Sequence, residues 1–256
     1  MKLGFSEDAA RYESASQTAR SLTETWAATH LFCPACGADR LNKLPNNAPV
    51  ADFECAACSE QFELKAKKGP FGRKVVDGAY ATMRARLAAR DNPNLALMSY
   101  DSRASAVRSL IVVPKHFFVP EIIEERPPLA PTARRAGWIG CNIRLDRIPD
   151  SGRIFLVRDG AVVAREHALS QWRRTRFLAT IRDESRGWLI ETMACVERIG
   201  RSAFTLQDVY AWEAHLGALF PGNRHVREKI RQQLQRLRDN GYLRFTGNGS
   251  YELVRP

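Results

Sequence analysis

The feature that most constrains this 256-residue chain is a pair of short cysteine motifs in its first quarter. Cys33-Pro-Ala-Cys36 and Cys55-Ala-Ala-Cys58 are two Cys-x-x-Cys pairs with 18 residues between them. Four thiolates at such spacing are typical of a tetrahedral zinc site that is closed by protein ligands and stabilises the surrounding fold. We therefore predict that Cys33, Cys36, Cys55 and Cys58 bind one structural zinc ion.

The N-terminal residues and the remaining cysteines agree with this interpretation. The stretch MKLGFSEDAARYES lacks the continuous apolar segment and small-residue end of a secretory signal, so we expect a cytoplasmic protein with reduced thiols. Cys141 and Cys195 are isolated, and we expect them to be ordinary core or loop residues. No run of about 18 apolar residues occurs, so no membrane span and no membrane partner are expected.

The charge of the chain points to a polyanion. The formal net charge is +11 and the isoelectric point is near 9.7. Nucleic acid is the commonest partner of so basic a protein, although an excess of positive charge also serves solubility alone. With 45% hydrophobic residues the chain can bury a full core as one large domain or two smaller ones, and nothing implies an obligate protein partner.

The first part of the chain mixes helical and strand periodicities and predicts an α/β or α+β domain. Helices are expected over 8–29 and 77–90, and Trp26 and Trp172 are expected in cores. Strands are expected over 50–54, 61–66, 95–100, 109–114 and 153–158. The Pro-, Ala- and Gly-rich stretch 126–142 is expected to be a loop.

The C-terminal part has the element order of a winged helix. A helix is expected over 186–199, and Thr205 can cap a second helix that runs to about residue 220. Asn223 can cap a third helix that continues through Asp239 and ends at Gly241, before a hairpin around Thr246-Gly-Asn-Gly. Trp188 and Trp212 are expected in cores. We place the domain boundary between 182 and 183, giving domains 1–182 and 183–256.

Positive charge gathers on the third helix of this winged helix. Residues 224–238 hold six Lys or Arg and one Glu, a net charge of +5, whereas 183–256 as a whole holds 11 Lys or Arg and nine Asp or Glu, a net charge of +2. The predicted buried side carries Val226, Ile230, Gln233 and Leu237, with Leu234 at its margin. The charged side is either a solvated face or a surface for a DNA major groove. Under the second interpretation the candidate contacts are Arg224, His225, Arg227, Arg231 and Gln232.

Carboxylates and a lysine follow the second cysteine pair closely. Asp52 lies on the strand before Cys55, while Glu63 and Lys65 lie on the strand after Cys58. Because alternate residues of a strand share a face, Glu63 and Lys65 should point together while Leu64 faces the core. If the two strands pair, Asp52 and Glu63 can share one Mg²⁺, and Lys65 can orient the attacking water or offset transition-state charge. The alternative is an exposed strand edge with ordinary surface charges.

Asp52 with Glu63-Leu64-Lys65 resembles the PD-(D/E)xK nuclease motif, with Ala51 in place of the proline. Longer stretches are more specific, among them CPACGADRLNKLPNNAPVADFECAACSEQFELKAKKG, VVDGAYATMRAR, PLAPTARRAGWIGCNI and HVREKIRQQLQRLRD. In this order, over nearly the whole chain, they resemble the DpnI-type methyl-directed restriction endonucleases.

This resemblance implies a PD-(D/E)xK α/β core with a four-cysteine zinc site, followed by a C-terminal winged helix that also reads the methylated site. It implies Mg²⁺-dependent cleavage of double-stranded DNA at GATC sites carrying N6-methyladenine. Asp52, Glu63 and Lys65 are then the catalytic residues, with Asp52 and Glu63 as magnesium ligands. Arg224 departs from the smaller polar residue that the resemblance favours there.

Reading a methyl group requires an apolar or aromatic surface, and one methyl contributes about 1 kcal/mol on burial. Trp138 lies between glycines in ARRAGWIGCN, where Arg134 and Arg135 can hold phosphates. By themselves these residues favour a core tryptophan under a loop; the resemblance instead assigns all three residues to DNA binding. Two other functions stay open at this point: a zinc-containing winged-helix regulator that does not cleave DNA, and a nuclease with altered sequence or methylation specificity.

Overall fold

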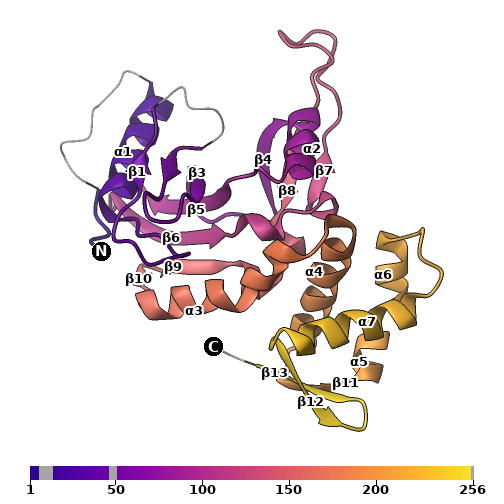
Figure 1. The fold of residues 1–256 in the computed structure, drawn as a ribbon. Coiled ribbons are helices and arrows are strands. Elements are labelled where there is room, and N and C mark those ends of the chain that lie inside the picture. Colours follow the sequence, from indigo (N-terminus) through magenta and orange to yellow (C-terminus); the bar gives the residue numbers. More distant parts are fainter. Residues whose placement is uncertain (6–13, 46–50, 255–256) are drawn as a thin grey trace. The chain divides into compact units, whose positions relative to one another are not determined.

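The computed structural model describes residues 1–5, 14–45 and 51–254 (Figure 1). The chain folds into two compact units, each assembled from three separate segments. The first unit consists of Met1–Gly72, Ala89–Lys115 and Arg153–Arg173, and the second consists of Arg73–Ala88, His116–Gly152 and Arg174–Pro256. Among the described helices, none is both long and apolar enough to cross a membrane.

The first unit is built on a seven-stranded sheet in the order β1-β2-β3-β5-β6-β9-β10. Only β3 and β5 pair in parallel; the other neighbours are antiparallel. The strands are β1 (Asn42–Lys43), β2 (Phe53–Glu54), β3 (Gln61–Lys68), β5 (Asn94–Asp101), β6 (Ala106–Val113), β9 (Ile154–Arg158) and β10 (Ala161–Val162). The helices that belong with this sheet are α1 (Ala15–His30) and α3 (Arg165–Thr175).

Buried side chains that alternate along the central strands form the core of the first unit. Phe62 of β3, Met98 of β5 and Val112 of β6 are fully buried in one cluster, which also holds Trp26 of α1 and Trp172 of α3. Leu64 packs against the same cluster, so the neighbouring β3 residues 63 and 65 point to the other side. This confirms the core positions predicted for Trp26 and Trp172.

Strand β3 is an edge strand over most of its length. Among the described strands, β2 pairs with β3 only at Phe53↔Phe62 and Glu54↔Gln61, and the later residues of β3 pair with β5 alone. The predicted strand 50–54 is therefore shorter than expected, and Val50 lies outside the described residues. Of the predicted helix 8–29, residues 8–13 also lie outside them, and α1 starts at Ala15.

The second unit contains a three-stranded antiparallel sheet in the order β4-β8-β7, made of β4 (Lys74–Ala79), β7 (Ile123–Glu125) and β8 (Gly140–Arg144). Helix α2 (Tyr80–Ala89) follows β4, so the prediction of helix from residue 77 was wrong at its start. Val75 and Val76 alternate between buried and exposed against β8, as β-branched residues on a pleated surface do. Part of the stretch expected to be a loop, from Gly140 onward, is strand β8.

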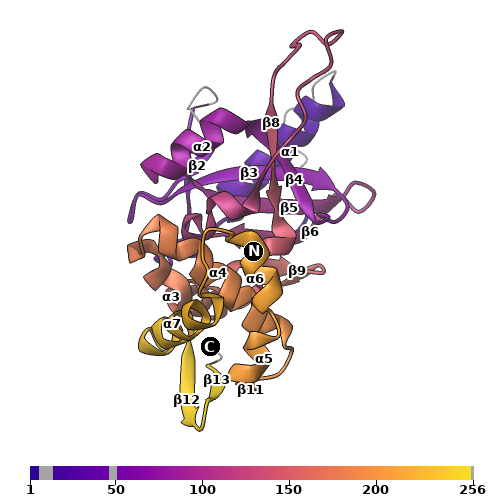
Figure 2. The same ribbon diagram turned by 90° about the vertical axis from the view of Figure 1, so that its right-hand side faces the viewer.

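The winged helix lies in the second unit and confirms the predicted order of elements (Figure 2). It consists of α4 (Asp183–Arg198), β11 (Ala203–Thr205), α5 (Leu206–Tyr210), α6 (Glu213–Leu219), α7 (Val226–Asp239), β12 (Leu243–Gly247) and β13 (Ser250–Leu253). Its sheet has the order β11-β13-β12. Thr205 caps α5 through a capping box with Asp208, as predicted.

Three details of the winged helix differ from expectation. The second helix is broken, because the N–H of Trp212 bonds to Val209 three residues back and the tighter turn starts α6 in a new direction. Trp212 is consequently only half-buried, whereas Trp188 is in the core as predicted. The cap of α7 is His225 rather than Asn223, whose side chain instead accepts the His225 N–H in a turn before the helix.

The buried side of α7 also differs in one position. Ile230, Gln233, Leu234 and Leu237 are all completely buried, so Leu234 belongs to the core and not to its margin. Gly241 has φ +71°, the left-handed conformation expected of a residue that follows a helix end, and this confirms its predicted role.

Candidate active site and nucleic-acid interface

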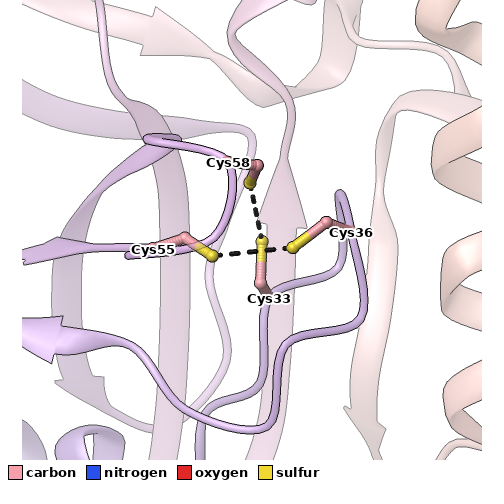
Figure 3. A group of neighbouring side chains, drawn as sticks. All are labelled: Cys33, Cys36, Cys55 and Cys58. Carbon is pink, nitrogen blue, oxygen red and sulfur yellow. Dashed lines mark hydrogen bonds between the residues drawn. The ribbon is translucent and has the colours of Figure 1, made fainter.

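The four predicted zinc ligands converge in the first unit (Figure 3). Their sulfur atoms all lie within 4.8 Å of one another, and the Cys33–Cys58 and Cys36–Cys55 pairs are each 3.6 Å apart. A disulfide would need about 2.05 Å. Thiolates placed tetrahedrally at about 2.3 Å from a zinc ion lie about 3.8 Å from each other. The four thiols could therefore hold one zinc ion.

The two cysteine turns repeat the same backbone design. In each, the first cysteine bonds through its N–H to the residue five positions on, Ala38 or Glu60, and through its C=O to the residue four positions on. That residue, Gly37 in one turn and Ser59 in the other, has a positive φ. The matching hydrogen bonds make each Cys-x-x-Cys turn a rigid knuckle that presents two sulfurs to one point.

Backbone N–H groups within each knuckle also face sulfur. Burial raises the pKa of Cys33 despite the N–H groups of Cys36 and Ala35. At Cys55, burial acts in the same direction, but the N–H groups of Ala57 and Cys58 and the thiols of Cys36 and Cys58 together outweigh it, so the pKa is lowered. Such donors stabilise a thiolate, which is the form that binds a metal.

Asp52 is fixed against the exposed edge of β3. Its N–H bonds to the C=O of Phe62 at 2.9 Å, and its Oδ2 accepts the N–H of Leu64 at 2.8 Å. The carboxylate thus takes the next hydrogen-bonding position of the edge, where a longer β2 would have placed a backbone carbonyl. Its other oxygen, Oδ1, lies 3.7 Å from Arg20 of α1.

Glu63 and Lys65 share a side of β3, as their spacing predicted. Lys65 Nζ lies 2.8 Å from Glu63 Oε1. Both line a cavity of about 420 Å³ together with Asp52, and its other lining residues are Ser16, Ala19, Arg20, Thr23, Glu24, Leu64 and Ala66. The structure therefore brings the three predicted catalytic residues to one cavity.

A third carboxylate at this cavity, Glu24 of α1, was missed in the sequence. It is buried, with Lys43 Nζ 2.7 Å from its Oε2 and Arg20 bonded to its Oε1. The only signal in the sequence is an Arg-Glu pair four residues apart, which is common on exposed helix faces and does not indicate a site. Its burial beside Asp52 depends on how α1 packs against β3.

The two acids on either side of Arg20 respond differently to this environment. Burial raises the pKa of Asp52, and the N–H of Leu64 only partly offsets that shift. Burial also acts to raise the pKa of Glu24, but hydrogen bonds from Arg20 and Lys43 outweigh it and the pKa is lowered. Asp52 is thus a desolvated carboxylate that a cation would stabilise, whereas Glu24 already has its cations.

In the second unit, the predicted contacts on and before α7 are all exposed: Arg224, His225, Arg227, Arg231 and Gln232. Two of them are held by side chains of the preceding helices. Arg227 Nε donates to Glu213 at 2.7 Å, and one terminal nitrogen of Arg231 donates to the Tyr210 hydroxyl at 2.9 Å. The basic face of α7 is therefore partly organised before any ligand is present.

The β7–β8 connection is an extended arm that carries the other predicted contacts and reaches away from its own sheet (Figures 1 and 2). Arg134 and Arg135 are exposed near its tip, while Trp138 is half-buried. The Trp138 ring lies so close over Gly140 that a Cβ there would meet it at 2.7 Å. Trp138 is thus not a core residue. Its half-buried ring packs against Gly140 at the base of the arm.

Comparison with known families identifies the family of this chain. The model of the DpnI Dam-replacing family matches residues 1–181, and that of the Dam-replacing helix-turn-helix domain matches residues 184–253. The chain belongs to the Dam-replacing family. Membership of this DpnI family indicates a methylation-dependent restriction endonuclease, and the second match indicates DNA binding. The predicted α/β fold with a four-cysteine cluster and a C-terminal winged helix is confirmed.

Proposed function

We propose that this protein is a Mg²⁺-dependent endonuclease that cleaves double-stranded DNA at GATC sites carrying N6-methyladenine. Residues 1–182 perform the cleavage, and residues 183–256 form a second reader of the site. The observation that carries the proposal is the meeting of Asp52, Glu63 and Lys65 at one cavity, with Asp52 locked to β3. The DpnI family membership supports the choice of substrate.

The carboxylates of this cavity fit a hard cation. Asp52 and Glu63 would hold Mg²⁺, which prefers oxygen ligands, and Asp52 Oδ1 is the oxygen not engaged by the Leu64 N–H. When bound, the ion neutralises charge that develops on the phosphate and promotes ionisation of a water. The raised pKa of Asp52 supports this assignment, because an added cation relieves a desolvated carboxylate.

The cationic side chains around the cavity act on the phosphodiester itself. Lys65, held at 2.8 Å from Glu63, is placed to orient the attacking water and to offset negative charge in the transition state. Arg20 lies across the cavity between Glu24 and Asp52, where it can hold a phosphate oxygen next to Asp52 Oδ1. Glu24 positions Arg20 and does not take part in the reaction.

Zinc serves structure in this proposal. The four thiolates would fill the four positions of a tetrahedral zinc ion and leave none for water. The second knuckle is joined to β2 on one side and leads to β3 on the other, so a bound ion would fix the turn between Asp52 and Glu63. Metal analysis of the purified protein should find about one zinc per chain. A folded protein that contains no zinc would contradict this role.

The methyl groups are read by surfaces that present apolar or aromatic atoms beside cations. Trp138 offers such a surface with Arg134 and Arg135 on the same arm. On the winged helix, the exposed basic side of α7 supplies phosphate and base contacts from Arg224, His225, Arg227, Arg231 and Gln232. A single methyl contributes only about 1 kcal/mol, so two readers multiply a discrimination that neither achieves alone.

One experiment tests the function and its alternatives. Two preparations of the same plasmid, one with N6-methyladenine at its GATC sites and one without, are incubated with the protein and Mg²⁺ and resolved on a gel. Cleavage of the methylated plasmid alone, with fragment ends at GATC, is expected. Cleavage of neither, with DNA binding retained, would identify a non-cleaving regulator. Cleavage of both, or at other sites, would identify a nuclease of different specificity.

A further inference from the structure

Two arginines on the basic side of α7 are held by side chains of the two preceding helices. Glu213, in the first turn of α6, accepts a hydrogen bond from Arg227 Nε at 2.7 Å. Tyr210, the last residue of α5, accepts one from Arg231 through its hydroxyl at 2.9 Å, and its ring centroid lies 5.1 Å from the Arg227 guanidinium. Tyr210 and Glu213 thus form a clamp across the start of α7, which we call the arginine clamp.

The arginine clamp matters because arginines that no side chain holds bind DNA phosphates without regard to sequence. Sequence-independent binding to DNA comes almost entirely from cations that neutralise phosphates, and long exposed side chains find them in many geometries. Residues 224–238 carry a net charge of +5, enough for considerable binding to any duplex. A carboxylate 2.7 Å from one guanidinium removes one unit of that charge and restricts the directions in which the side chain can reach.

The two members of the clamp act differently on their arginines. Glu213 adds a charge, so it opposes phosphate binding by Arg227 directly. Tyr210 is neutral: its hydroxyl and ring restrict the guanidinium groups without changing their charge. Glu228, on α7 itself, adds a second contact to Arg231 at 3.1 Å. Arg231 is therefore oriented by the neutral Tyr210 hydroxyl and paired with an acid of its own helix, while Arg227 is neutralised by Glu213 from another helix.

We propose that Glu213 and Tyr210 are specificity-determining residues of the DNA interface: Glu213 weakens binding to DNA of any sequence, and Tyr210 orients Arg231 for the specific complex. The inference rests on the DNA-binding part of the proposed function. It requires no contact between either residue and DNA. Its consequence is that the enzyme holds methylated sites while leaving other DNA readily.

The test measures binding to a GATC duplex, methylated or unmethylated, by fluorescence anisotropy of the full-length protein at several salt concentrations without Mg²⁺. For Glu213→Gln we expect affinity for the unmethylated duplex to rise about 3- to 10-fold at low salt. The slope of log affinity against log salt should steepen by about 0.9, as one more phosphate contact forms. The ratio of methylated to unmethylated affinity should fall at least about threefold.

Tyr210→Phe separates orientation from charge. It keeps the ring beside Arg227 and removes only the hydroxyl, so the unmethylated affinity and the salt slope should not change, while methylated affinity falls about threefold, the effect of one modest hydrogen bond. The matched control is Glu166→Gln, which removes an exposed carboxylate from α3 in the first unit and gives the same net charge as Glu213→Gln. It should leave both affinities and the slope unchanged.

The outcomes distinguish the inference from the function beneath it. If the wild-type protein bound neither duplex, DNA binding itself would be wrong. If it bound DNA but Glu213→Gln bound the unmethylated duplex no more tightly, or lost affinity for both duplexes equally together with a lower melting temperature, Glu213 would be only a structural residue. An equal gain in Glu166→Gln would attribute the effect to overall charge and would overturn the clamp.

Discussion

Two buried carboxylates, one in each unit, show how partners decide what burial does to a charge. Glu24, beside the cavity of the first unit, is 6% exposed; Glu191, on α4 in the second, is 1% exposed. Glu24 bonds to Arg20 and Lys43, and its pKa is lowered. Among the described residues, neither carboxylate oxygen of Glu191 has a hydrogen-bond partner, and burial raises its pKa to about 7.

The imidazole that lies within 4 Å of Glu191 does not stabilise its charged form. His215 Nε2 lies 3.8 Å away, but burial together with the charges of Arg198 and Arg147 lowers the pKa of that imidazole. His215 is therefore neutral near pH 7 and supplies no opposing charge. Arg147 and Arg198 also favour the ionised form of Glu191, while Glu121 and Asp146 oppose it, so desolvation decides the outcome. Burial at similar depth therefore leaves one acid stabilised as a carboxylate by two cations and the other destabilised in its charged form.

The largest expected effect tests whether Asp52, the desolvated acid of the cavity, serves catalysis. Asp52→Asn keeps an oxygen to accept the Leu64 N–H but removes the charge that would bind Mg²⁺. Plasmid cleavage should fall by at least about 1,000-fold, which corresponds to about 4 kcal/mol of transition-state stabilisation. Binding of methylated DNA in the absence of cleavage, measured by anisotropy, should be retained. Cleavage within tenfold of wild type would show that Asp52 holds no essential ion.

The next largest effect is a gain in stability when the buried carboxylate of Glu191 in the winged helix is replaced by a neutral amide. Glu191→Gln should raise the free energy of unfolding at pH 8 by up to about 3 kcal/mol, because a shift from 4.5 to about 7 corresponds to that cost of ionisation. A raised native pKa means that the contribution of Glu191 is fully favourable below pH 4.5 and is lost as pH rises through about 7. The gain in denaturant unfolding should therefore shrink at pH 6 and disappear near pH 4.5. An equal gain at every pH would attribute the effect to packing.

Glu24→Gln should have the opposite sign and a smaller size. Removing this acid leaves Arg20 and Lys43 without their shared carboxylate, but both cations are partly exposed and water replaces much of the loss. We expect about 1–2 kcal/mol lower stability at pH 7 and about tenfold slower cleavage, since Arg20 is no longer positioned. Because the native pKa is lowered, the stability difference should vanish as pH falls well below 4.5. Unchanged cleavage with reduced stability would limit Glu24 to a structural role.

The smallest effect is expected at a helix cap of the winged helix, where the acid, Asp208, is accessible to water. The capping box at Thr205 and Asp208 satisfies N–H groups at the start of α5, so Thr205→Ala should lower the free energy of unfolding by about 1 kcal/mol. The measurement is denaturant unfolding at pH 7, followed by the plasmid assay. Cleavage by the folded protein should be unchanged. A loss of cleavage as great as that of Glu24→Gln would show that cleavage depends on local stability in the same way in both units.

Several parts of the site followed from local sequence. The four cysteines, the shared side of Glu63 and Lys65, the Thr205 cap and the basic side of α7 each depend on spacing within one or two elements, and short-range geometry fixes them. The errors occurred where long-range packing decides. Residues 77–79 read as helix until β8 pairs with them, and Leu234 reads as marginal until it is buried within the winged helix.

The sequence by itself determined the four-cysteine cluster, the placing of Asp52, Glu63 and Lys65, and the order of helices and strands. Each of these is set by the identity and spacing of residues close along the chain. Only the tertiary structure decided that Asp52 closes the edge of β3, that Glu24 lies buried beside it, and that Glu213 and Tyr210 hold two arginines of α7. These contacts join segments from different elements, and whether a carboxylate is solvated, paired or stranded depends on the environment that those elements create around it.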